Sequence, residues 1–294
     1  MKNYSSSLKG SVFIAISALF FASYGIWSRL MNGVFGEFNQ AWIRALILLF
    51  ILLPFGFLTR TFTKIKSKDL SWFVLIALAG GLNQAPYFYG FEHLPIGTAT
   101  LLFYLMLTVG AYLIGKLFFN EKITILKYIS LLLAIIGLFI IYQFSLNAGQ
   151  IIPALASMVS GLLGACVVVF SKKLSSNYSE TQILTGIFIA MFLINLSISC
   201  LLGEHFPSLQ VVAWFGEIGY TIAMVIANIA VIAGFRYLEP SIGGIIGLLE
   251  VILAAIFGIL FFGEVITIEL IIGSLFILLA AGLADFVSLI KNKN

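Results

Sequence analysis

Uncharged apolar stretches long enough to cross a lipid bilayer recur along the whole sequence. The hydrocarbon core of a bilayer is about 30 Å thick, and a helix crosses it in about 20 residues. Three such stretches, Leu70–Phe91, Leu94–Gly115 and Thr181–Gly203, contain no Asp, Glu, Lys or Arg. They predict membrane-spanning helices, because transmembrane strands are only about 10 residues long and alternate in polarity.

The same criterion predicts ten spans in all. The other seven lie at residues 10–28, 45–59, on either side of the Asn147–Gln150 turn within 128–171, and at 211–235, 242–262 and 268–290. With 61% hydrophobic and only 10% charged residues, the chain falls far outside the soluble class, in which about 25% are charged. We therefore expect an all-α integral membrane protein of ten transmembrane helices.

Net charge and cysteine content exclude several other classes of protein. A formal charge of +4 is too small and too scattered for a nucleic-acid-binding surface. The two cysteines, Cys166 and Cys200, lie in apolar runs and form neither a disulfide framework nor a zinc cluster. We expect no cofactor and no bound metal.

The basic residues predict the orientation of the chain. All Lys and Arg residues except Arg29 and Arg44 fall at one end of the predicted spans. Cytoplasmic loops are enriched in Lys and Arg, so this end is expected to face the cytoplasm. Both termini are then cytoplasmic, which requires an even number of spans, and the protein is expected in the cytoplasmic membrane.

The sequence repeats itself at an offset of 143 to 145 residues. Gly90–Pro95 is echoed by Gly234–Pro240, and Leu117–Thr124 is echoed by Leu260–Thr267. Each repeat contains five predicted spans, so residues 1–146 and 147–294 form two five-helix domains. Because five is odd, the second domain enters the membrane from the opposite side.

Inverted repeats are typical of secondary transporters, in which two related halves exchange two nearly equivalent packings. That exchange opens a central site first to one face of the membrane and then to the other. The alternative is that duplication only produced a stable bundle.

The repeated motifs resemble the EamA-type transporters of the drug/metabolite transporter superfamily. The resemblance rests on the "LFF-x-E-x-IT" ending of the fourth and ninth spans, on Ile43–Ala45, and on Leu248–Ala254. It covers nearly the whole chain, one unit in each half. The resemblance implies a central cavity lined by spans 1, 3, 4, 6, 8 and 9, with spans 5 and 10 at the periphery.

Glu250 is the strongest candidate for a functional residue, because it lies near the middle of the ninth span. Ionisable side chains at this depth are costly and mark functional sites. Gly243, Gly247 and Ala254 lie on the same helix face. The carboxylate suits either a substrate cation or a coupling proton; the alternative is a hydrogen-bonded packing residue.

Four further charged residues lie within spans or close them. Arg44, inside the second span, is expected to snorkel or to pair with a carboxylate and is a candidate for gating or coupling, with substrate contact as an alternative. Glu217, in the first turns of the eighth span, is expected to reach the outer aqueous vestibule. Glu121 and Glu264 occupy equivalent repeat positions and are interpreted as helix-end or gating groups.

Polar and aromatic side chains in the spans predict a pocket, because buried amides and phenols need partners that acyl chains cannot supply. The predicted substrate-binding residues besides Glu250 are Asn83, Gln84, Tyr87, Tyr104, Tyr24, Trp27 and Asn228. A pocket of Tyr and Trp with one carboxylate favours a small amphipathic solute, with an amine held by cation–π contact.

These observations predict a secondary active transporter of a small metabolite, such as an amino acid, an amine or another amphipathic solute. The expected partners are this solute, membrane lipid and a coupling proton or cation; the oligomeric state stays open. Within this class, uptake of a nutrient or a quaternary amine is an alternative to export. A non-transporting scaffold or lipid-handling protein is the competing class. An intramembrane enzyme is disfavoured, because no paired catalytic groups are present.

Overall fold

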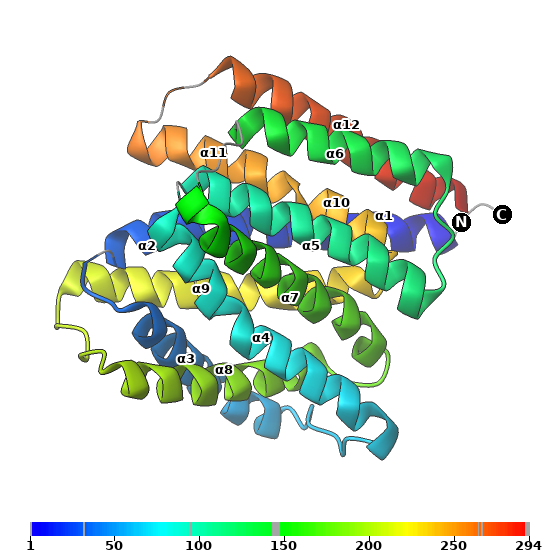
Figure 1. Ribbon diagram of the computed structural model, residues 1–294. Helices are drawn as coiled ribbons and strands as arrows, with labels where there is room; N and C mark the ends of the chain where they lie inside the picture. The colour runs from blue at the N-terminus through cyan, green and yellow to red at the C-terminus, as the bar shows by residue number, and fades with distance from the viewer. Residues whose placement is uncertain are drawn as a thin grey trace.

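The computed structural model describes residues 2–31, 33–94, 96–142, 148–263, 265 and 267–291, and these contain helices but no strands. The helices are α1 (Lys2–Ala22), α2 (Tyr24–Met31), α3 (Glu37–Leu58), α4 (Ser67–His93), α5 (Ile96–Phe119), α6 (Ile125–Tyr142), η1 (Ala148–Gln150), α7 (Ile151–Ser175), α8 (Glu180–Leu202), α9 (Val211–Phe235), α10 (Pro240–Gly247), α11 (Leu249–Phe262) and α12 (Ile268–Lys291). The long helices lie alongside one another in one bundle (Figure 1).

Two of the long helices in the bundle are each interrupted at a single residue. Ser23 separates α1 from α2, and Leu248 separates α10 from α11. At both points the chain makes a tighter turn, in which the amide of Ser23 donates to Phe20 O and the amide of Leu248 donates to Ile245 O. The two interrupted helices lie next to each other, since α1 contacts both α10 and α11.

The length and apolar character of the helices make this an integral membrane protein. Among the described residues, seven helical stretches are long and apolar enough to cross a membrane, and the apolar stretches Ile125–Ile141 and Ile268–Leu283 are shorter. The helix α4, with 27 residues, is not among the seven. The count of ten spans therefore stays a prediction.

The helix contacts repeat when the two halves of the chain are exchanged. α4 packs on α7 as α9 packs on α1 and α2, and α5 packs on α7 as α10 and α11 pack on α1. The pairs α6–α12 and α3–α8 map onto themselves under this exchange. Corresponding helices run in opposite directions, as α1 and α7 show in Figure 1. The predicted boundary at residues 146 and 147 lies outside the described residues.

The start of α1 and the end of α12 lie at the same end of the bundle (Figure 1). The loops rich in Lys and Arg gather there and contact one another: Arg236 pairs with Glu180 at 2.7 Å, and the Lys66 amide donates to Tyr178 Oη. We call this end of the bundle the basic end. Its composition is the one that the positive-inside rule expects of a cytoplasmic face.

Glycines allow a close helix contact between α6 and α12, which lies at one edge of the bundle (Figure 1). A Cβ added at Gly273 would lie 2.5 Å from Gly137 O, and one at Gly137 would lie 2.7 Å from Gly273 O. Small residues are the usual means by which membrane helices approach this closely. The contact forms between the fifth helix of each half, far from the centre of the bundle.

We expect Gly273→Ala to push α6 and α12 apart and to lower the free energy of unfolding by about 1–3 kcal/mol, as overpacking does elsewhere. Gly282→Ala on the same helix is the control, because nothing lies within 4 Å of the added Cβ there. Thermal unfolding of both variants in detergent checks this. Equal stability of the two variants would contradict it.

Candidate functional site

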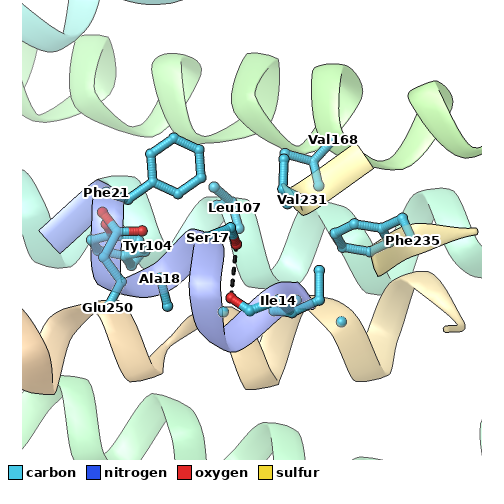
Figure 2. Close-up of a pocket in the computed structure, with 13 residues that line it drawn as sticks. Ile14, Ser17, Ala18, Phe21, Tyr104, Leu107, Val168, Val231, Phe235 and Glu250 are labelled. Carbon is cyan, nitrogen blue, oxygen red and sulfur yellow. Dashed lines mark hydrogen bonds between the residues drawn. The ribbon is translucent and has the colours of Figure 1, made fainter. Parts of the chain in front are cut away.

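A cavity of about 50 Å³ lies between helices of both halves of the chain, and Figure 2 shows residues that line it. Its wall is formed by α1, α5, α7, α9, α10 and α11, and its lining residues are Ile14, Ser17, Ala18, Phe21, Tyr104, Leu107, Val168, Val231, Phe235, Gly243, Gly244, Gly247 and Glu250. These helices belong to five of the six spans that the family resemblance implies for the lining. The sixth, α4, supplies none of the described lining residues.

Glu250 is the one carboxylate among the described residues that line the cavity, and no Lys or Arg is among them. It lies two residues after the interruption at Leu248, in the first turn of α11. Figure 2 shows Glu250, Tyr104 and Phe21 at one end of the cavity, and Val231 and Phe235 at the other. The Tyr104 side chain thus lies at the same end of the cavity as the Glu250 carboxyl group. The site thus combines one acidic group with an otherwise largely apolar wall.

Arg44 forms a buried ion pair with Glu217, in which Arg44 Nη2 lies 2.8 Å from Glu217 Oε2 and neither side chain is exposed. The prediction that Arg44 pairs with a carboxylate is confirmed. The prediction that Glu217 reaches an aqueous vestibule is wrong, because α3 and α9 pack together and cover it. A carboxylate two turns inside a helix needs a partner of opposite charge, and Arg44 supplies it.

The Arg44 guanidinium also lies on the ring of Tyr220, 3.5 Å from the ring centre. Tyr220 in turn stacks on Tyr24, with 4.1 Å between the ring centres. Phe21 contacts Tyr24 edge to face at 5.4 Å and lines the cavity. Of these residues, the sequence interpretation included Tyr24 but missed Tyr220, although Tyr220 lies three positions from Glu217, on the same face of α9.

The predicted pocket residues of α4 are engaged with α7 and α5 instead of lining the cavity. Asn83 Nδ2 donates to Ser160 O at 2.7 Å, and Ser160 Oγ donates to Asn83 O at 2.8 Å. Tyr87 packs on Phe103, with 4.4 Å between the ring centres. Gln84 is partly buried next to them.

Two other predicted pocket residues also lie outside the cavity lining. The Trp27 indole donates to Ser23 Oγ at 3.1 Å, and its ring covers Gly219 of α9. Asn228 Nδ2 donates to Met224 O of its own helix at 2.9 Å. Of the predicted substrate-binding residues, the structure therefore places Tyr104 and Glu250 in the cavity and Tyr24 one contact away from it.

We expect Asn83→Ala to lower the free energy of unfolding by about 1 kcal/mol, because it removes one helix–helix hydrogen bond. Ser160→Ala, which removes the reciprocal bond, should have a similar effect. Thermal unfolding measures both changes. Loss of solute affinity in Asn83→Ala at unchanged stability would instead assign Asn83 to the substrate site.

Glu121, at the basic end, lies in a buried charge cluster. Lys127 Nζ is 3.4 Å from Glu121 Oε2 and 2.6 Å from Glu239 Oε2, and the Lys127 side chain is almost fully buried. Glu121 and Lys127 belong to the first half of the chain, and Glu239 belongs to the second. In the sequence, Lys127 is one of the basic residues that flank the predicted spans, and nothing there indicates that it is buried. Glu264, the repeat equivalent of Glu121, lies outside the described residues.

The fold and the cavity define a helical membrane protein built from two related halves around a central acidic site. The model of the EamA-like transporter family matches residues 8–143 and again residues 151–284. The chain therefore belongs to the EamA-like transporter family, whose members are transporters rather than enzymes. Transport of a small molecule across a lipid membrane is the function that this membership supports.

The bundle is also found among solved structures, of which 29 chains match. One of them, from a structure titled "Crystal structure of protein", aligns with a TM-score of 0.81 at 16% sequence identity, covering 96% of this chain and 99% of that chain. At this identity the likeness establishes a shared fold alone. No curated protein matches the sequence.

Proposed function

We propose that this protein is a secondary active transporter that carries a small amphipathic cation across the cytoplasmic membrane by alternating access. The observation that carries the proposal is the Glu250 carboxylate in a central cavity, beside a break in a membrane helix. Interrupted helices at the interface of two repeats are where secondary transporters bind substrates and coupling ions.

The proposed topology has ten spans, arranged as two inverted five-helix domains at residues 1–146 and 147–294. The opposite directions of corresponding helices and the exchange symmetry of their contacts support it. The basic loops at the end where α1 begins and α12 ends favour cytoplasmic termini. Two inverted halves can exchange their packings, which is the physical basis of alternating access.

The lining of the cavity supports a cationic substrate with an apolar body. Glu250 supplies one negative charge, and Phe21, Phe235 and Tyr104 supply aromatic faces. A carboxylate in an apolar wall attracts a cation or takes up a proton, and aromatic faces bind amines by cation–π contact. Competition of substrate and proton for Glu250 would couple transport to the proton gradient.

The size of the cavity supports a movement of the surrounding helices when a solute binds. Sites for drug-sized ligands measure about 300–1,000 Å³, whereas this cavity has about 50 Å³. Binding a solute therefore requires the surrounding helices to move apart. Such a movement is what alternating access provides at each face in turn.

The proposal is tested by flux into proteoliposomes that contain the purified chain. Radiolabelled aromatic and aliphatic amines are compared with their uncharged isosteres, with a pH gradient imposed and then collapsed. We expect saturable uptake of at least one amine, no uptake of its uncharged isostere, and loss of accumulation when the gradient is collapsed. A chain that moves none of these solutes, or that moves charged and neutral forms alike, would overturn it.

A further inference from the structure

We infer that the Tyr24–Tyr220 stack, held by the buried Arg44–Glu217 pair, is the gate that closes the central cavity toward the end of the bundle opposite the basic end. Arg44 and Glu217 then act as positioning residues, which hold the gate through Tyr220. The inference goes beyond the proposed function, because it assigns a separate set of residues to the control of access.

The position of the stack along the helices places it next to the cavity on that side. The chain enters α1 at the basic end, and Ile14, Ala18 and Phe21 line the cavity in succession. Tyr24 follows one turn after Phe21, just beyond the interruption at Ser23. Tyr220 lies in the part of α9 that precedes the lining residue Val231, on the same side. The stack therefore lies between the cavity and the far end of the bundle.

The stack joins the two halves of the protein. Tyr24 and Arg44 belong to the first half, and Tyr220 and Glu217 belong to the second. The ring–ring contact at 4.1 Å, the guanidinium–ring contact at 3.5 Å and the ion pair at 2.8 Å all cross this interface. Tyr24 lies on α2, Arg44 on α3, and Tyr220 and Glu217 lie on α9. A movement of α2 or α3 against α9 would separate these groups, as a gate requires.

Unsatisfied polar atoms are concentrated in this layer. Tyr24 Oη, Arg44 Nε, Arg44 Nη1 and Glu217 Oε1 are all buried without a hydrogen-bond partner. Buried polar atoms in folded proteins nearly always have partners, and those that lack them call for an explanation. Four such atoms in one layer favour a state in which the layer opens and water reaches them.

On the basic side of the cavity, the two halves are joined by a different kind of contact. Lys127 links Glu121 and Glu239 across the two halves, and Lys172 donates to Leu238 O in the same linker between α9 and α10. The aromatic layer and this charge cluster thus lie at opposite ends of the cavity. Lys127 consequently offers a matched control for a test of the aromatic gate.

Side-specific labelling of a cavity cysteine tests the inference without knowledge of the substrate. The reporter is Ala18→Cys, in a chain whose Cys166 and Cys200 are replaced by Ala. A membrane-impermeant methanethiosulfonate is applied to either face of oriented vesicles. We expect Tyr220→Ala to raise the labelling rate from the face opposite the basic end by about tenfold, because the stack is lost. Tyr220→Phe, which keeps the ring, should label like the parent chain.

Glu217→Gln provides a second test that leaves both rings in place. It removes the charge that holds Arg44 over Tyr220, so labelling should again rise from the face opposite the basic end. Lys127→Met should instead raise labelling from the basic face alone. Equal rates for Tyr220→Ala and Tyr220→Phe, or a rise of equal size from both faces, would overturn the inference. The labelling assay does not measure flux. Its result would therefore still test the gate if the amine-transport proposal failed.

Discussion

Glu250→Gln should lower the apparent affinity for a transported amine by about 10- to 100-fold, since it removes a charge-assisted hydrogen bond. The amide fills nearly the same volume, so the cavity wall and the packing of α11 on α1 are kept. It cannot exchange a proton at neutral pH, so accumulation driven by a pH gradient should be lost as well. Uptake into proteoliposomes, with and without the gradient, measures both effects.

Glu269→Gln is the matched control for this substitution. It neutralises a carboxylate in the first turn of α12, outside the lining of the cavity, and should leave affinity and gradient dependence unchanged. Equal thermal stability of the two variants shows that the difference in transport comes from the site. Unchanged uptake by Glu250→Gln would remove Glu250 from the mechanism.

The sequence predicts the helices well because a chain in lipid can adopt few backbone conformations. Backbone groups in a bilayer must be paired within the segment, so each long apolar stretch becomes a helix, as Thr181–Gly203 does in α8. The duplication was visible for a similar reason, since equal motifs such as Leu117–Thr124 and Leu260–Thr267 fix equal positions in each half. Membership of the family that these motifs resemble is confirmed.

The site was harder to predict, because composition shows which residues are polar but not which partner satisfies them. Asn83 and Tyr87 share a helix face with glycines, and the sequence cannot tell whether that face meets a cavity or another helix. The structure places it against α7 and α5. Glu250 and Tyr104 reach the same cavity because α10, which leads into α11, packs on both α1 and α5. This packing brings together segments about 145 residues apart in the sequence.

Glu217 shows the same limit for charged residues. Its distance from the start of α9 indicated a shallow position, because depth along one helix is all that a sequence gives. Burial depends on what packs alongside, and α3 brings Arg44 to it from 173 residues away. Glu217 is therefore buried in an ion pair, and not exposed to solvent as expected, because of tertiary packing.

Removal of either partner of the Arg44–Glu217 pair should cause the largest loss of stability in the molecule. Arg44→Met leaves the Glu217 carboxylate buried without its counter-charge. Glu217→Met likewise leaves the Arg44 guanidinium buried without a counter-charge. Breaking a buried pair in this way costs about 3–5 kcal/mol, whereas replacing both partners by apolar side chains of similar volume is often nearly neutral. We therefore expect Arg44→Met/Glu217→Met to be more stable than either single variant.

Denaturant unfolding of the four proteins in detergent gives the coupling energy of the pair as a double-mutant cycle. Glu180→Gln is the control, because its pair with Arg236 is partly exposed, and exposed pairs contribute only about 0–1 kcal/mol. Single variants as stable as Glu180→Gln would show that water reaches the Arg44–Glu217 layer. The double variant can also be tested in the cysteine-labelling assay. If it is stable but is labelled rapidly from the face opposite the basic end, the charges of Arg44 and Glu217 hold the Tyr220 ring in place and are not needed to stabilise the fold.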